Sequence, residues 1–436
     1  MKNRIYVKLG AIILLIFLFM IPRWSIKDLV RERVNLSRDT QREVSSKWAN
    51  SQVLTGPYMS IPFSQILTDK DGVADISTTK KYIHLMPKAM NVKAIMNPEI
   101  RKRSIYKVLL YNSVIDIDGA FDLGLLSILI NDEMIVHWNE ASINLGLSDL
   151  RGIEKEIIMD VNGDSLLSYS GLSDTDVASR GIHIPFPIDT NVNIYNYSTQ
   201  ILLKGSSKWS VIPVAKNNTI ELKSSHPSPS FVGAFLPDYR KVCKTGFEAK
   251  WNILSLNLDY PSSWIGDQYK ITENSVGTRL LSGVNNYDKV NRAIKYSSLF
   301  IVLTFTLLFF IEIMKRTPIH PIHYILIGIN LVLFFILLLS LSEFVSFNLS
   351  YGIATILTIS MISLFAKSIT KSFQLSAFLF GVLFLVYGFI FVIMQLEYFS
   401  LLVGSLGLVF ILGIVMYYSR KIDWYGISKE LKEKHL

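Results

Sequence analysis

The stretch IHYILIGINLVLFFILLLSL, residues 322–341, decides the fold class of this chain. It contains no charged side chain, and a helix of about 20 apolar residues crosses the ~30 Å hydrocarbon core of a bilayer. Backbone groups inside lipid must satisfy their own hydrogen bonds, so such a stretch is expected to be a spanning helix. Three similar stretches lie at 296–314, 372–394 and 398–418. The chain is therefore expected to be a polytopic membrane protein.

A fifth candidate span, residues 345–366, is uncharged but more polar. Ser346, Ser350, Ala354 and Thr358 recur in it every four residues, which places small side chains on one helix face. Such a face allows a neighbouring helix to come close. Packing explains the pattern better than a transport path, which remains the alternative.

The remaining sequence is less apolar. Half of the 436 residues are hydrophobic, but they concentrate in residues 9–22 and in the C-terminal third. Residues 23–295 read like a water-soluble domain and are numerous enough to build a core of their own. The single cysteine, Cys243, excludes an intrachain disulfide and cysteine-based zinc or redox motifs.

The N-terminal apolar segment follows Lys2, Arg4 and Lys8, as in a signal peptide. However, it ends in FLFMIPRWS, which offers no small-x-small cleavage site. We therefore favour a retained anchor over a cleaved signal peptide.

Basic residues occur in alternate short loops. If residue 1 is cytoplasmic, the inner side receives Lys315, Arg316, Lys367, Lys371, Arg420, Lys421, Lys429, Lys432 and Lys434. The turns near 342–344 and 395–397 contain no Lys or Arg. This distribution follows the positive-inside rule and predicts six spans with both termini in the cytoplasm. It also attributes the net charge of +9 to membrane topology rather than to nucleic-acid binding.

The sequence thus divides into four predicted parts. They are an anchor (1–23), a periplasmic β-rich domain with an N-terminal helix (24–295), a five-helix transmembrane domain (296–418) and a cytoplasmic basic tail (419–436). The helix at the start of the second part has apolar residues on one face and is interpreted as a stalk or as an ordinary surface helix.

Within the second part, segments rich in β-branched and aromatic residues indicate strands. They lie at 105–119, 134–147, 192–205 and 247–259. Asn162-Gly163 is a strong two-residue hairpin signal. Many strands without alternating helices favour an antiparallel sandwich- or barrel-like fold, so the whole chain is expected to be an α+β membrane protein.

Known catalytic and phosphate-binding motifs were not found in the sequence, so we expect no enzyme activity and no cofactor. His320 and His323 flank Pro321 and are interpreted as interfacial imidazoles, with a metal site as the alternative. Asp149 and Arg151 fit a catalytic acid with a positive clamp, but turn residues after a strand, with Gly152 relieving the backbone, are favoured.

Other candidate positions combine a structural and a functional interpretation. The segment SSHPSPSFVGAFLP (224–237) is predicted to be an extended loop, or alternatively a docking surface. Glu312 lies within a span, close enough to Lys315 and Arg316 for a local ion pair. Glu343 and Glu397 are expected to be exposed at the outer surface. The candidate functional residues are Asp149, Arg151, His226, Pro227, Phe231, Arg240, Glu312, His320, His323, Glu343 and Glu397.

Several motifs together resemble the CreD family of bacterial inner-membrane proteins. They are GPYMSIPF (56–63), SDLRGI (148–153), HPSPSFVGAFLP (226–237), GFEAKW (246–251), RAIKYSSLFIVLTF (292–305), HYILIGINLVLFFILLLSLSE (323–343), EYFSLLVGS (397–405) and RKIDWY (420–425). The resemblance covers nearly the whole chain. It implies a role in cell-envelope integrity and colicin tolerance, and it supplies no catalytic residue or cofactor.

Three functional hypotheses follow. The first is a non-enzymatic inner-membrane protein whose periplasmic domain meets an envelope protein or polymer. The second is a transporter or transporter subunit, although the spans show no inverted repeat. The third is a membrane-embedded enzyme acting on lipid or envelope polymer, with Glu343 and Glu397 as acid and base. The lipid bilayer is the expected partner in each case, and the sequence indicates no oligomeric state.

Overall fold

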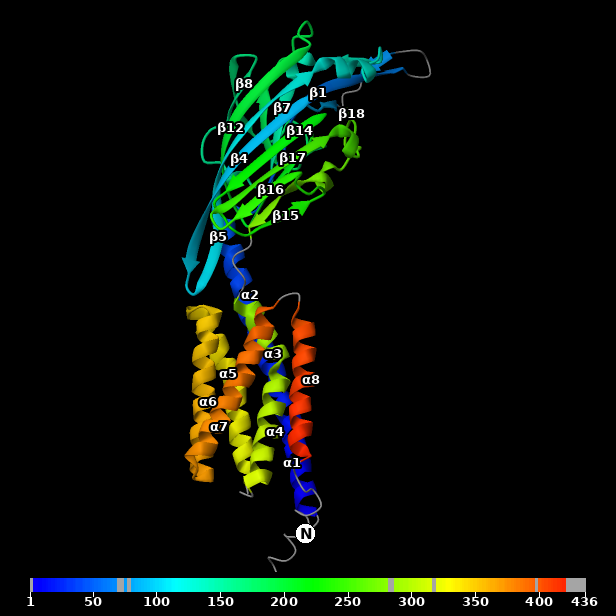
Figure 1. Ribbon diagram of the computed structural model, residues 1–436. Coiled ribbons are helices and arrows are strands. Elements are labelled where there is room, and N and C mark those ends of the chain that lie inside the picture. The colour runs from blue at the N-terminus through cyan, green and yellow to red at the C-terminus, as the bar shows by residue number, and fades with distance from the viewer. Residues whose placement is uncertain are drawn as a thin grey trace, which may run out of the picture. The chain divides into compact units, whose positions relative to one another are not determined.

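The computed structural model describes residues 3–68, 74–76, 80–280, 286–315, 319–396 and 399–420 (Figure 1). The chain forms two compact units. The helical unit comprises Met1–Ser37 and Val284–Leu436, and the β unit comprises Arg38–Gly283. The domain boundaries predicted from the sequence stay predictions, because compactness does not show which residues enter a bilayer.

Apolar helices dominate the helical unit, and they run side by side in Figure 1. The helices are α1 (Asn3–Met20), α2 (Pro22–Trp48), α3 (Asn286–Lys295), α4 (Ser297–Lys315), α5 (Pro321–Phe344), α6 (Phe347–Thr370), α7 (Phe373–Gln395) and α8 (Ser400–Ser419). Among the described residues, four helices are long and apolar enough to cross a membrane. They are the helix Lys8–Trp48, α5, α6 and α7.

The number of spans is smaller by this criterion than the six expected from the sequence. A fifth span results if α3 and α4, which meet at a 45° bend, are counted together. The described apolar part of α8, Leu402–Tyr417, is shorter than a typical span. An α+β membrane protein with several apolar helices is therefore confirmed, and the sixth span stays a prediction.

Aromatic and small side chains pack the helical unit. Phe300 on α4 contacts Phe334 on α5 and Tyr387 on α7, with ring centroids 5.3 and 4.4 Å apart. The small residues Ser350, Ala354 and Thr358 of α6 are buried. The Asn330 side chain on α5 donates a hydrogen bond to the Thr358 carbonyl at 3.1 Å. The predicted packing of this α6 face is thus confirmed for these three residues, whereas Ser346, the fourth predicted member, is exposed and precedes the helix.

Helix α1 packs against the other apolar helices through Phe19. Its ring lies 6.1 Å from that of Phe305 on α4, edge to face. On α5, a Cβ added to Gly328 would lie 2.2 Å from the Phe19 ring, so a larger residue there requires Phe19 to move. The Phe19 ring of α1 therefore packs against both α4 and α5.

The stretch Lys8–Trp48 is helical over 41 residues, with a single turn residue between α1 and α2. At about 1.5 Å per residue it measures roughly 60 Å, twice the thickness of a hydrocarbon core. Only its apolar first half suits lipid, because α2 is charged over most of its surface. The prediction of a helix at the start of the second part is confirmed.

The β unit contains two sheets among the described residues. The larger follows the order β10-β11-β7-β1-β13-β19-β15, with β2, β3, β6 and β18 attached beside this path. Its strands are β1 (Gln52–Thr68), β2 (Ala74–Ile76), β3 (Lys81–Leu85), β6 (Met134–Val136), β7 (Ser142–Leu147), β10 (Tyr169–Ser170), β11 (Gly181–Pro185), β13 (Lys208–Ile212), β15 (Pro229–Gly233), β18 (Ser263–Ile265) and β19 (Val276–Leu280).

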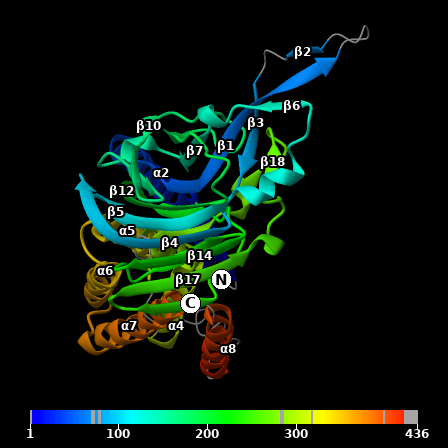
Figure 2. The same ribbon diagram turned by 90° about the horizontal axis from the view of Figure 1, so that it is seen from above.

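The second sheet follows the order β16-β17-β14-β4-β5-β12-β8-β9, and several of these strands lie side by side in Figure 2. Its strands are β4 (Ala89–Arg103), β5 (Tyr106–Asp122), β8 (Ile158–Val161), β9 (Asp164–Leu167), β12 (Ile194–Ser206), β14 (Asn217–Ser224), β16 (Tyr239–Cys243) and β17 (Gly246–Leu254). Pairing is antiparallel except between β1 and β13 and between β4 and β14. Both sheets have free ends in the described residues, so neither closes into a barrel there.

The hairpin predicted at Asn162-Gly163 is confirmed. It joins β8 to β9, and both turn residues have positive φ, 53° for Asn162 and 99° for Gly163. Positive φ at both central positions is the requirement of the tight type I′ turn. The predicted strand at 134–147 is wrong in its middle, where Trp138–Glu140 forms a 3-10 turn between β6 and β7.

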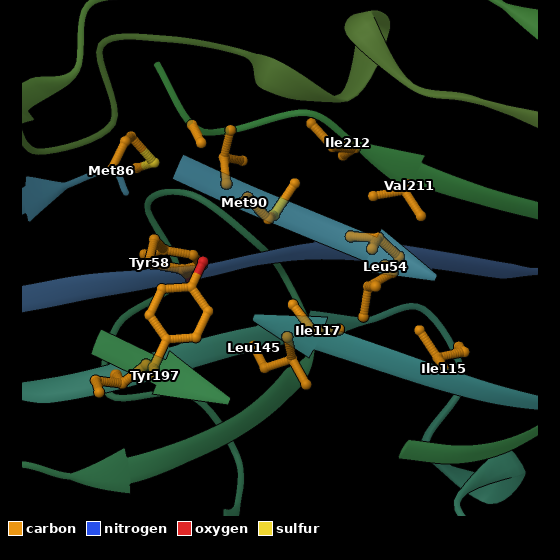
Figure 3. Close-up of a cluster of buried hydrophobic side chains, with 14 of the residues drawn as sticks. Leu54, Tyr58, Met86, Met90, Ile115, Ile117, Leu145, Tyr197, Val211 and Ile212 are labelled. Carbon is orange, nitrogen blue, oxygen red and sulfur yellow. The ribbon is translucent and has the colours of Figure 1, made fainter. Parts of the chain in front are cut away.

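Side chains from both sheets meet in one hydrophobic cluster (Figure 3). Leu54 and Val211 come from the larger sheet, whereas Met90 and Ile117 come from the second. All four are 0–1% exposed. Burial of an aliphatic side chain contributes about 1.5–3 kcal/mol, so this shared cluster is a main source of the β unit's stability.

Candidate functional site

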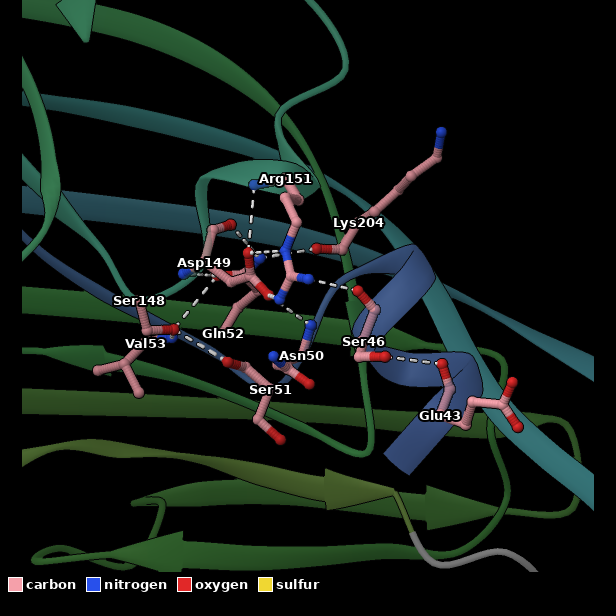
Figure 4. Close-up of polar contacts among 10 residues, drawn as sticks. All are labelled: Glu43, Ser46, Asn50, Ser51, Gln52, Val53, Ser148, Asp149, Arg151 and Lys204. Carbon is pink, nitrogen blue, oxygen red and sulfur yellow. Dashed lines mark hydrogen bonds and ion pairs between the residues drawn. The ribbon is translucent and has the colours of Figure 1, made fainter. Parts of the chain in front are cut away.

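Asp149 and Arg151 form the most highly connected of the predicted pairs. Asp149 precedes the 3-10 turn Leu150–Gly152 and accepts a hydrogen bond from the Arg151 backbone N–H at 3.2 Å. The Arg151 guanidinium binds both carboxylate oxygens, with Nε 2.9 Å from Oδ1 and Nη2 2.7 Å from Oδ2. Asn50 donates its backbone N–H to Oδ2 at 2.9 Å (Figure 4). The Asp149 carboxylate is therefore surrounded by donors from Arg151 and Asn50.

This cluster joins three segments of the β unit. Arg151 also donates to the Ser46 carbonyl at the end of α2. Gln52 at the start of β1 donates to the carbonyls of Asp149 and Lys204, at 2.9 and 3.0 Å. Hydrogen bonding from Arg151 lowers the pKa of Asp149 to about 2, so the ion pair persists at any ordinary pH.

The predicted reason for Gly152 is wrong. Gly152 is absent from the glycines with positive φ, so its backbone needs no relief. Instead, a Cβ added there would lie 2.4 Å from the Gln52 amide nitrogen and 2.4 Å from the Lys204 carbonyl oxygen. Glycine is required because the chains approach closely.

The segment 224–237 is more ordered than the predicted extended loop. Pro229–Gly233 forms the edge strand β15, which pairs with β19. Proline at the first position of an edge strand leaves the ladder intact. Phe231 packs edge to face on Phe247 and Trp251, at 5.8 and 6.0 Å, so it faces the core rather than a partner.

The other predicted residues near this segment do not form one site. His226 is buried, and its backbone N–H donates to the Ser224 hydroxyl at 3.2 Å. Pro227 is exposed, and Arg240 is exposed on β16. The structure therefore provides structural roles for His226 and Phe231 and none for Pro227 and Arg240.

Glu312 on α4 has a partner that sequence reasoning missed. Its carboxylate pairs with Lys8 of α1 and accepts hydrogen bonds from the Ile319 backbone N–H at 3.2 Å and from the Tyr324 hydroxyl at 3.1 Å. Lys8 also donates to the Ile319 carbonyl at 2.6 Å. The side chains of the predicted partners, Lys315 and Arg316, lie outside the described residues. The Glu312 carboxylate thus has donors from α1, from α5 and from the segment before α5, and these contacts hold α1 against α4 and α5.

The side chain of Glu343 at the end of α5 is largely covered, so the prediction of an exposed carboxylate is wrong. Its side chain is 9% exposed and lies 3.5 Å from the Arg33 guanidinium of α2. The Tyr287 hydroxyl of α3 is 3.4 Å away. Three helices of the helical unit thus meet at this carboxylate. Glu397, its predicted catalytic partner, lies outside the described residues.

His320 and His323 have separate roles. The His320 ring caps α5 by accepting a hydrogen bond from the Ile322 backbone N–H at 3.3 Å. The His323 ring packs edge to face on Phe365 of α6 at 5.4 Å. These contacts favour the interpretation as packed imidazoles near a helix end.

Sequence reasoning missed a further polar cluster, formed by His84, Asp174 and Asp176 in the β unit. One ligand atom from each residue lies within 4.8 Å of the others. His84 belongs to β3, whereas the two aspartates belong to the connection between β10 and β11. The D-T-D spacing at 174–176 was a visible local signal, but nothing in the sequence connects it with a histidine 90 positions earlier.

The apolar helices and the two-sheet unit inserted between α1 and α4 define an integral, multi-pass membrane protein. Comparison with known proteins specifies the family. The chain belongs to the CreD family, whose model, described as "Inner membrane protein CreD", matches residues 4–425. Inner membrane protein CreD of Escherichia coli (strain K12) is 28% identical over 448 positions, which cover 98% of this chain and 95% of that relative. The resemblance inferred from the sequence motifs is thus confirmed, and the chain is a multi-pass inner-membrane protein.

Proposed function

We propose that this protein holds the β unit in the periplasm and thereby supports the integrity of the cell envelope, without catalysing a reaction. The family match supports the membrane location. The observation that carries the orientation is the alternation of charge at the helix ends. Lys315 ends α4, and Lys367 and Lys371 flank the end of α6, whereas no Lys or Arg lies between α5 and α6 or between α7 and α8.

The same alternation supports six spans with both termini in the cytoplasm. α5, α6 and α7 alternate in direction, so the basic end of α4 and the basic end of α6 fall on one side. The apolar helix α1 must then cross once more to place residues 38–283 on the other side. The β unit, with its own hydrophobic core, needs no support from lipid in that location.

Retention of α1 as an anchor is part of this proposal. Removal of α1 would leave the Glu312 carboxylate without Lys8 and would remove the Phe19 ring that packs on Gly328. Loss of one partner from a buried ion pair typically costs about 3–5 kcal/mol. This cost supports a mature protein that keeps its N-terminal helix.

The contacts of the candidate residues also support a non-enzymatic role. The carboxylate oxygens of Asp149 already accept hydrogen bonds from Arg151 and Asn50. Those of Glu312 already pair with Lys8 and accept hydrogen bonds from Ile319 and Tyr324. Glu343 faces Arg33 within the helical unit. Each of these carboxylates already has donors from the protein itself, which supports a structural use. The transporter and lipid-enzyme hypotheses therefore gain no specific observation from these residues.

The experiment is complementation in cells that lack the protein. Release of a periplasmic marker and sensitivity to detergent are measured with the wild type, with Asp149→Ala and with the exposed control Arg240→Ala. We expect the deletion to leak, Arg240→Ala to restore the barrier, and Asp149→Ala to restore it only in proportion to the amount of folded protein. An intact barrier in the deletion strain would contradict the envelope role. The non-enzymatic role would be contradicted if the wild type showed a measurable turnover that Asp149→Ala lacks, and if that variant failed to restore the barrier although it is folded and fully abundant.

A further inference from the structure

His84, Asp174 and Asp176 bring one nitrogen and two oxygen donors together in the β unit. His84 Nε2 lies 3.2 Å from Asp176 Oδ2 and 3.9 Å from Asp174 Oδ1. Around a tetrahedral zinc ion with bonds of ~2.0–2.1 Å, neighbouring ligand atoms are roughly 3.3–3.4 Å apart. His84 Nε2 and Asp176 Oδ2 already have about this separation, and the Asp174 oxygen, which lies within 4.8 Å of both, must move closer for the three to surround one ion.

The geometry points to a binding site for one divalent transition-metal ion of the zinc class, which we propose with His84, Asp174 and Asp176 as its protein ligands. Mixed imidazole and carboxylate donors suit this class of ion. The site goes beyond the proposed envelope function and does not depend on it.

The imidazole is held in position from its other side. His84 lies in β3 between Ser60 of β1 and Trp264 of β18, and its side chain is fully buried. Its Nδ1 is 3.2 Å from the Ser60 hydroxyl oxygen. A metal-binding histidine typically donates its second ring N–H to such an acceptor, which fixes the tautomer and directs the free nitrogen to the ion. Ser60 is placed for this role.

A single asparagine connects both halves of the site. The Asn144 amide donates to the Ser60 hydroxyl at 2.9 Å and to the Ser173 hydroxyl at 2.7 Å. Its carbonyl oxygen accepts the Ser173 backbone N–H at 3.1 Å. The residue that supports His84 through Ser60 thus also fixes the start of the segment that carries both aspartates. Such a preorganised outer layer is the usual support of a metal site.

The two carboxylates are held relative to each other as well. Asp174 Oδ1 accepts the Asp176 backbone N–H at 3.1 Å, and Oδ2 lies 3.3 Å from the Ser173 hydroxyl. The Asp174 side chain is 3% exposed, whereas that of Asp176 is 28% exposed. The Asp176 side is therefore open to solvent, which provides an entry path for an ion and room for water as a further ligand.

The second observation is an unsatisfied hydroxyl beside the carboxylates. Tyr58 is fully buried, and its hydroxyl has no hydrogen-bond partner among the described residues. Its ring packs edge to face on that of His84, with the ring centroids 6.2 Å apart, so Tyr58 adjoins the proposed ligands. Buried hydroxyls normally have a partner, and a water bound to an ion at this site would supply one.

Charge balance favours a cation at this position. Two carboxylates face one imidazole, so even a protonated His84 would leave a net negative charge in a mostly buried cluster. A divalent ion with a neutral imidazole makes the cluster neutral. The competing explanation is an ion pair between a protonated His84 and the carboxylates without any metal, and the experiment must separate the two.

The test uses the purified full chain in mild detergent, stripped with a chelator and then titrated with Zn²⁺ alone. We expect one tightly bound Zn²⁺ per chain by calorimetry and by metal analysis after dialysis, with a rise in Tm on binding. Asp176→Asn should weaken this binding more than 100-fold, and Ser60→Ala, which leaves all three ligands in place, should weaken it about 10- to 100-fold. Folding of each variant is checked by tryptophan fluorescence.

The control is His320→Gln, which removes one histidine of the neighbouring pair His320 and His323 in the helical unit and should leave the single site unchanged. Failure of the folded wild type to retain stoichiometric Zn²⁺ would overturn the proposal, whatever the variants do. Binding that survives in Asp176→Asn, or that disappears in His320→Gln, would also overturn it. A folded wild type whose Tm is unchanged by Zn²⁺ would identify the metal-free ion pair instead.

Discussion

Replacement of Asp149 by asparagine should destabilise the β unit by about 2–3 kcal/mol at neutral pH. The substitution keeps the size of the side chain but removes the charge that holds Arg151 in two hydrogen bonds, at 2.9 and 2.7 Å. It also turns one acceptor oxygen into an NH₂ group, so either Arg151 or the Asn50 backbone N–H loses its acceptor. The expected loss is substantial because the Asp149 side chain is only 8% exposed.

The lowered pKa of Asp149 gives a second value for the free energy that this ion pair contributes to folding. Its value of about 2 in the folded chain lies below the usual 3.8. The depressed pKa means that the pair stabilises the folded state above pH ~4, and that this stabilisation disappears as the pH falls towards 2. The difference corresponds to about 2 kcal/mol.

The assay is urea unfolding of the full chain in mild detergent, followed by the fluorescence of tryptophans such as Trp209 and Trp251, which are buried in the β unit. The control is Asp164→Asn, an exposed residue after the Asn162-Gly163 turn, which should change the free energy of unfolding by less than about 0.5 kcal/mol. The reasoning is refuted if Asp149→Asn matches this control. It is equally refuted if lowering the pH from 4 to 2 reduces the free energy of unfolding of Asp149→Asn as much as that of the wild type.

Three further substitutions test close contacts. Gly152→Ala should cost about 1–3 kcal/mol in the same urea assay, because the added Cβ collides with two fixed polar groups; unchanged stability would show that the segments separate easily. Gly328→Ala should lower the Tm in detergent because the added methyl group collides with the Phe19 ring. Phe19→Ala in the same chain should restore part of the lost Tm, and no recovery would contradict the packing of Phe19 on Gly328. Glu312→Gln should lower the Tm because Lys8 loses its counter-charge, and adding Lys8→Met to the same chain should recover part of the loss. A double variant whose Tm falls by the sum of the two single changes would contradict the ion pair.

The membrane helices were predictable because their signal is local. Each of α5, α6 and α7 is a continuous apolar run, and the observed ends differ from the predicted spans by a few residues. The α6 face with Ser350 and Thr358 was predictable for the same reason, since a four-residue period is visible in one segment. Strand content and the Asn162-Gly163 hairpin likewise depend on neighbouring residues.

Pairing between distant segments was not predictable from one sequence. β1 pairs in parallel with β13, about 150 positions later, and no pattern within either strand specifies that partner. The Lys8–Glu312 contact joins residues 304 positions apart. The same limit hid the His84 cluster, because its three ligands come from two segments that only the folded sheet brings together.

The location of the β unit across the membrane from the basic loops is the central claim, and the native Cys243 tests it directly. This residue is exposed on β16, and a hydrogen bond with Thr245, 3.1 Å from the sulfur, lowers the pKa of its thiol and favours the reactive thiolate. In cells with an opened outer membrane and an intact inner membrane, a membrane-impermeant maleimide should label Cys243. A second chain carries Cys243→Ser together with Ser372→Cys, so that its single cysteine lies between α6 and α7. This cysteine should react only after the inner membrane is broken. Labelling of position 372 but not of Cys243 in intact cells would contradict the account.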